Sequence, residues 1–172
     1  MATIHQRITN CLWFDSEAEE AAQFYTSIFP NSSIGTISRY GKEGFEQHQQ
    51  PEGKVMLVMF TLDGQEFMGL NGGPLFPFTE AISLVVNCKD QAEIDYYWDR
   101  LTKGGEEVQC GWLKDKFGVS WQVNPIQMRE MMAKGTPEQL ERVTAAYMKM
   151  KKFDLKKLEE AYRGSVSMGV DQ

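Results

Sequence analysis

The sequence has few of the residues that metal and thiol chemistry require. Its 172 residues include only two histidines, His5 and His48, and three cysteines, Cys11, Cys88 and Cys110. No two cysteines form a C-x-x-C pair. Cys11 and Cys88 lie in apolar, strand-like runs, where a free cysteine behaves as a small hydrophobic residue. We therefore predict inert, reduced thiols.

Long apolar runs and a basic excess are also absent. No apolar stretch of the sequence approaches the roughly 18 residues that a membrane span needs, and the first five residues lack the apolar core of a signal peptide. The sequence has 18 Lys and Arg residues and 24 Asp and Glu residues, which gives a formal net charge of −6. This acidic balance argues against nucleic acid as the main partner. We expect a cytoplasmic protein without membrane or nucleic-acid partners.

What the sequence does contain is a set of helix caps. Ser16-Glu17-Ala18-Glu19 has the pattern of a capping box, in which Ser and Glu side chains bond the first amides of a helix. Asp90 caps a second helix that ends at Gly104-Gly105. Thr136-Pro137-Glu138-Gln139 opens a third helix, and a short last one starts at Asp154 and ends at Gly164.

Strand-like segments fill the intervals between these helices, and the two halves of the chain repeat. A shift of 74 residues aligns Leu12 with Val86 and Ser16 with Asp90, which indicates a duplicated β-α-β-β-β unit. Asp63-Gly64 predicts a hairpin turn. We predict one domain over 1–125, with modules at about 4–73 and 79–125, and a C-terminal helical extension over 126–172. The predicted strands are 4–14, 33–40, 54–62, 66–71, 81–88, 107–113 and 119–124.

Motifs spread over most of the chain carry a family resemblance. The most specific is Trp112-Leu113 together with the run from Asp115 to Pro125; others are Leu12-Trp13-Phe14-Asp15, Met68 to Gly73 and Ile82 to Val86. These resemble the PhnB-like family of the vicinal-oxygen-chelate superfamily, which also contains glyoxalase I and extradiol dioxygenases. The resemblance implies an α+β fold, in which the duplicated modules form a U-shaped antiparallel or mixed sheet around a cavity, with helices outside.

Enzymes of that superfamily hold a divalent metal through His, Gln or Glu. The corresponding positions in this sequence fall at Thr9, Gly69, Ala81 and Gln122, which supply one weak ligand, so we predict no metal. If the alignment of the first strand were shifted, His5, four residues before Thr9, could take the first ligand position, but Gly69 and Ala81 would still supply no metal ligand. Many members of the family carry the name 3-demethylubiquinone-9 3-methyltransferase. No Gly-rich turn between a parallel strand and a helix supports an adenosine cofactor here, and we predict no cofactor.

Strand alternation predicts which side chains line the cavity. Thr9, Cys11 and Trp13 share one face of the first strand, while Ile8, Leu12 and Phe14 face the helix. The predicted ligand-binding residues are Thr9, Cys11, Trp13, Phe67, Asn71, Ser83, Trp112, Ser120 and Gln122. The alternative interpretation is that these residues fill a core and satisfy one another. Asp115 lies in a predicted turn and is expected to form local hydrogen bonds there. Five methionines predict an adaptable helical surface that seals a homodimer or a neighbouring module: Met128, Met131, Met132, Met148 and Met150.

Three functions fit this sequence. The first is a metal-free protein that binds a small aromatic or amphipathic molecule, with no catalytic residue assigned. The second is a metal-dependent lyase, isomerase or dioxygenase. The third is an interaction module with a vestigial cavity. Whether the protein is an enzyme stays open among them.

Overall fold

The computed structural model describes residues 6–164, and these fall into two units, Met1–Phe78 and Thr79–Gln172. The strand predicted from residue 4 begins at Asn10, and Ile4 and His5 lie outside the described residues. The helical extension belongs to the second unit. No helix of residues 6–164 has the length and apolarity to cross a membrane.

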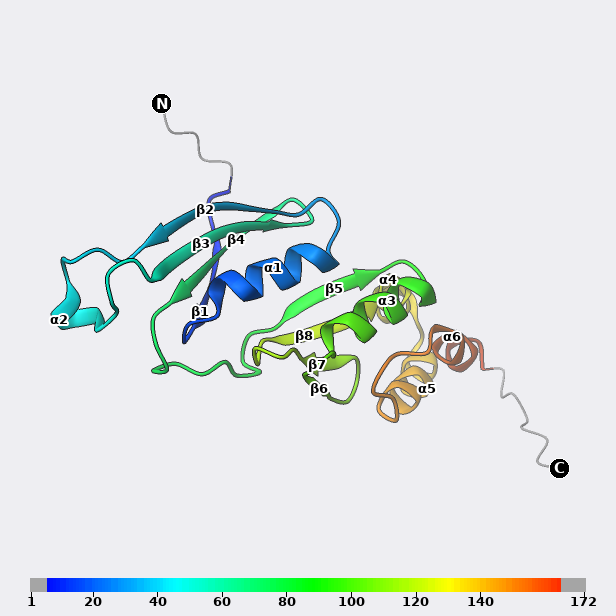
Figure 1. Ribbon diagram of the computed structural model, residues 1–172. Coiled ribbons are helices and arrows are strands. Elements are labelled where there is room, and N and C mark those ends of the chain that lie inside the picture. Colours follow the sequence, from blue (N-terminus) through cyan, green and yellow to red (C-terminus); the bar gives the residue numbers. More distant parts are fainter. Residues whose placement is uncertain (1–5, 165–172) are drawn as a thin grey trace. The chain divides into compact units, whose positions relative to one another are not determined.

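The first unit is a four-stranded sheet covered by one long helix (Figure 1). Its strands lie in the order β1-β4-β3-β2, in which β1 and β4 are parallel and the other pairs antiparallel. Helix α1 packs on one face of the sheet, with Ala18 against Gly69 and Tyr25 against Phe60. The elements are β1 (Asn10–Phe14), α1 (Ala18–Ile28), β2 (Ser33–Arg39), α2 (Phe45–His48), β3 (Val55–Leu62) and β4 (Gln65–Asn71).

The second unit repeats this topology, which confirms the α+β class and the duplication. Its sheet has the order β5-β8-β7-β6, in which β5 and β8 are parallel, as β1 and β4 are in the first sheet. The strand predicted over 107–113 divides into two short strands, because Cys110 and Gly111 take positive φ values of 59° and 79° between them. The elements are β5 (Leu84–Cys88), α3 (Gln91–Leu101), β6 (Glu106–Glu107), β7 (Trp112–Lys114) and β8 (Ser120–Pro125).

The predicted helix caps hold at three of the four sites. Asp90 Oδ1 accepts from the Glu93 amide at 2.9 Å, Asp154 caps the last helix, and Thr136 with Gln139 forms a complete capping box. The box at Ser16 is wrong. Helix α1 begins at Ala18, its N-cap residue Glu17 makes no side-chain cap bond, and the Ala18 amide donates instead to Asn71 Oδ1 on β4, at 2.8 Å.

Three helices follow the second sheet: α4 (Ile126–Lys134), α5 (Pro137–Tyr147) and α6 (Leu155–Arg163). Helix α4 has no counterpart among the predicted helices. The three helices share a core of Met131, Val143, Phe153 and Leu158, against which Met128 and Met150 pack. The methionines are thus mainly the core of this module, although Met132 and Met148 remain exposed. The homodimer stays a prediction.

Candidate ligand-binding face

One face of the second sheet is left uncovered by α3, and polar side chains gather on it. Helix α3 covers the face that carries Val86, Trp121 and Val123, all of them buried. On the opposite face Gln122 of the inner strand β8 lies between its register partners, Val85 on β5 and Trp112 on β7. We call this surface the open face of the second sheet, defined by Ser83, Val85, Trp112, Lys114, Ser120, Gln122 and Asn124.

Neutral hydrogen-bonding groups form a short chain along β8. The Gln122 amide nitrogen donates to Ser83 Oγ at 2.9 Å, and Asn124 Nδ2 donates to Gln122 Oε1 at 3.4 Å. Ser120 is only 1% exposed, and its hydroxyl has no hydrogen-bond partner among residues 6–164. Buried hydroxyls are normally bonded, so the Ser120 hydroxyl is a group whose missing bond a ligand could supply if the side chains that cover it move aside.

A charged pair borders the face at its Ser120 end. Lys114 is the register partner of Ser120, and its ammonium donates to the Glu80 carboxylate. This hydrogen bond and the charge of Lys114 lower the pKa of Glu80, and the same bond raises the pKa of Lys114. Neither residue was among the predicted ligand-binding set. The alternation that selected Ser120 and Gln122 also places Lys114 and Asn124 on this face, so the signal was in the sequence.

In the first unit, Cys11 and Trp13 lie on the face of the sheet that α1 does not cover, as predicted. Cys11 is exposed, but neighbouring protein atoms exclude some of the water around its sulfur, and this desolvation raises the pKa of the thiol. Trp13 is held by its neighbours, because its indole nitrogen donates to the Gly73 carbonyl at 2.8 Å and its ring meets Phe76 edge-on at 5.0 Å. Thr9 precedes β1, and its hydroxyl lies 3.4 Å from Glu66 Oε1.

The predicted face of β4 is wrong by one residue. Asn10 pairs with Phe67 and Phe14 with Asn71, and both Phe67 and Asn71 are buried on the helix-covered side, at 5% and 2% exposure. The reverse holds for Ile8, which was expected to face the helix and is 81% exposed. Asn71 bonds the start of α1 and the Val55 carbonyl. Its side chain therefore holds the first unit together.

Two further groups in the second unit have structural roles. The Asp115 carboxylate is 3% exposed and accepts from the Val119 amide at 3.0 Å and from the Trp121 indole at 2.8 Å, as a turn residue is expected to do. Cys88 is fully buried, and burial, with smaller contributions from Glu93 and Asp90, raises its pKa to about 12. Its thiol therefore stays protonated near neutral pH.

Comparison with known proteins gives the family. The model of the family described as 3-demethylubiquinone-9 3-methyltransferase matches residues 6–124. A PhnB protein from Bacillus cereus of solved structure, which carries the same description, is 42% identical, with a TM-score of 0.62 over 70% of this chain and 99% of that one. The chain belongs to this family. The matched region ends before α4, so the three C-terminal helices of this PhnB-like protein lie outside it.

More distant structures share the fold. A protein from Pseudomonas aeruginosa is 21% identical, with a TM-score of 0.55 over 70% of this chain and 97% of that one. The fosfomycin resistance protein FosX from Listeria monocytogenes is 16% identical, with a TM-score of 0.52 over 77% of this chain and all of that one. These likenesses show that the PhnB-like chain shares its fold with both proteins. No curated protein sequence matches it.

The residues at the superfamily's metal positions do not fit a metal. Gly69 has no side chain and faces α1, where a Cβ would lie 3.2 Å from that of Ala18. Gln122 supplies one neutral amide oxygen, Ala81 offers a methyl group, and the Thr9 hydroxyl lies by Glu66. Within residues 6–164 no three His, Cys, Asp or Glu side chains are grouped as metal ligands. His5 lies outside the described residues.

Proposed function

We propose that this PhnB-like protein binds a small aromatic or amphipathic molecule on the open face of the second sheet, without a metal. The observation that carries the proposal is the buried, unpartnered hydroxyl of Ser120, two residues along the strand from a neutral amide, Gln122, that lies between an indole and a half-exposed valine. Small-molecule sites combine apolar area with a few placed polar groups in this way.

The roles of the side chains follow from their chemistry. Trp112 supplies a flat ring for stacking, which favours an aromatic or otherwise planar ligand. Gln122 and Ser120 supply a carbonyl oxygen and a hydroxyl that direct a polar substituent, and both groups are uncharged. The Lys114–Glu80 pair at the edge neutralises its own charge, so the face favours a ligand that carries no net charge. The β1–α1 turn, Asp15-Ser16-Glu17, has no glycine to cradle a cofactor's phosphates.

A thermal-shift screen of neutral aromatic metabolites tests the proposal. A ligand present at 100 times its dissociation constant stabilises the folded protein by roughly 2.7 kcal/mol. Gln122→Ala removes the amide and is expected to weaken binding about tenfold while the protein stays folded. Gln109→Ala, the same change at an exposed position of the same unit, is the matched control and is expected to leave binding unchanged.

Three results would contradict this function. A Gln122→Ala protein that fails to fold would make Gln122 a structural residue. Equal binding by the Gln122→Ala and Gln109→Ala proteins would place the ligand elsewhere. Stoichiometric Ni, Zn, Fe or Mn in purified, active protein would favour the metal-dependent lyase, isomerase or dioxygenase over a metal-free binding protein.

A further inference from the structure

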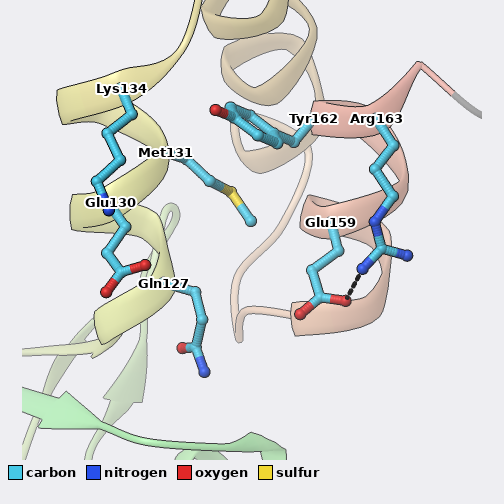
Figure 2. A pocket seen from close by; sticks show the side chains of 7 residues that line it. All are labelled: Gln127, Glu130, Met131, Lys134, Glu159, Tyr162 and Arg163. Carbon is cyan, nitrogen blue, oxygen red and sulfur yellow. Dashed lines mark hydrogen bonds and ion pairs between the residues drawn. The ribbon is translucent and has the colours of Figure 1, made fainter.

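The C-terminal helices line a cavity whose residues are not those of the sheet face. A cavity of about 380 Å³ lies between α4 and α6 (Figure 2), within the range of roughly 300–1,000 Å³ that is usual for small ligands. Helix α4 lines it at i, i+3, i+4 and i+7 with Gln127, Glu130, Met131 and Lys134, and α6 at i, i+3 and i+4 with Glu159, Tyr162 and Arg163. Each helix therefore turns one face towards the cavity.

Gln127 presents an unused acceptor in this cavity. Its amide nitrogen donates to the Lys89 carbonyl at 2.6 Å. Because a carbonyl can only accept, this bond fixes which end of the amide is nitrogen and turns Oε1 away from Lys89. Oε1 is buried, and no donor among residues 6–164 contacts it. An N–H group entering the cavity would supply the missing bond.

Four charged side chains line the cavity, two acidic and two basic: Glu130, Glu159, Lys134 and Arg163. In Figure 2 the Glu130 and Glu159 carboxylates reach towards the same end of the cavity as the Gln127 amide. Glu159 is bonded to Arg163 at 3.0 Å, whereas no ion pair of the described residues involves Glu130 or Lys134. Glu130 is therefore the carboxylate that a cationic head near Gln127 would meet. The cavity lining therefore carries acceptors from both helices, and a group with several N–H donors can bond more than one acceptor.

Away from Gln127, the cavity lining includes a thioether and an aromatic ring. The thioether of Met131 belongs to the buried core of the extension, and the Tyr162 ring packs against that core. Both side chains line the cavity, and Figure 2 shows Tyr162 at the end away from Gln127. A methionine and an aromatic ring accept a short apolar or aromatic body.

We propose that this cavity binds a small primary amine, with its ammonium between Gln127 Oε1 and the Glu130 carboxylate and its apolar body against Met131 and Tyr162. The ligand class is an arylalkylamine or short alkylamine. The site lies outside the residues that the family model matches, so it is a property of the extension and does not rest on the function proposed for the sheet.

Calorimetric titration of the full chain with three compounds that share a phenyl body tests the head group. Phenethylamine is expected to bind, 2-phenylethanol to bind about tenfold more weakly because it lacks the charge, and 3-phenylpropanoate not to bind. Tighter binding of the carboxylate would overturn the proposal, since Lys134 and Arg163 would then select the ligand. Absence of phenethylamine binding would overturn it as well.

Variants locate the site. Glu130→Gln removes an exposed carboxylate and is expected to weaken phenethylamine binding about tenfold, whereas Glu141→Gln on α5, the same change at an exposed position away from the cavity, is expected to have no effect. Gln127→Leu is expected to weaken binding further. Equal affinities of the Glu130→Gln and Glu141→Gln proteins would refute the site even if Gln127→Leu fails to fold. Gln122→Ala is expected to leave amine binding intact, which separates this site from the sheet face.

Discussion

Replacing Asn71 by alanine tests whether this residue holds the first unit together or belongs to a ligand site. In the structure its Oδ1 accepts from the Ala18 amide at 2.8 Å, and its Nδ2 donates to the Val55 carbonyl at 3.1 Å. Asn71 is 2% exposed, so water does not readily replace either bond. The alanine variant therefore leaves the first amide of α1 and a strand carbonyl without partners.

The size of the effect follows from those two groups. Each buried polar group that loses its partner costs about 1–3 kcal/mol, so the loss of two partners in Asn71→Ala is expected to lower the free energy of unfolding by about 2–6 kcal/mol. The local capping bond is also missing at Glu17, so no nearby side chain substitutes for Asn71. The expected fall in Tm is on the order of 10 °C.

Urea denaturation of the wild-type and variant proteins, followed by circular dichroism, measures this loss. Asn87→Ala on β5 is the matched control, because Asn87 is exposed and the change is chemically identical; we expect it to shift stability by less than about 0.5 kcal/mol. If Asn71→Ala unfolds at the same urea concentration as Asn87→Ala, the capping role is refuted. A ligand whose binding falls with Asn71→Ala at unchanged stability would restore Asn71 to a binding site.

Two further predictions concern the second unit. Gly111→Ala places a methyl group 2.4 Å from the Phe153 ring at a φ of 79°, while Gly118→Ala meets the same backbone strain at a φ of 85° with no atom within 4 Å. Faster amide exchange in α6 of the Gly111→Ala protein only is therefore expected, and equal exchange in both would refute the steric argument. Iodoacetamide at about pH 8 is expected to modify exposed Cys11 in the folded protein and to leave Cys88 unmodified, because the pKa of Cys88 is raised to about 12. Mass spectrometry measures both, and equal labelling of the two thiols would contradict the burial of Cys88.

The sequence predicted most of the fold because its strongest signals are local. The caps at Asp90, Thr136 and Asp154 act on amides three residues away, and the structure has all three. The predicted box at Ser16 failed because the cap of α1 comes from a residue 53 positions later in the chain. A local sequence pattern cannot show whether a helix uses the capping residue beside it or a side chain from a distant strand.

The residues of the candidate site were predicted less accurately than the fold. Alternation placed Ser83, Ser120 and Gln122 on one face, where the register puts them, but it misplaced Phe67 and Asn71. Both faces of β4 carry apolar residues, so periodicity alone left its orientation undecided. Gly69 was the available signal. Helix α1 lies so close to β4 that a Cβ there would be 3.2 Å from Ala18, and a glycine in a strand often marks such an approach.

The parallel pairing of the first and last strand in each sheet has a consequence for synthesis of the chain. Every strand pairing of residues 6–164 lies within one unit, and the first sheet is complete once β4 has paired with β1 at Asn71. The first unit can therefore form all its strand pairings while the ribosome is still translating the second. Folding from the N-terminus onwards then leaves the strands of only one half without their sheet partners at a time, which limits the interval in which nascent chains can aggregate.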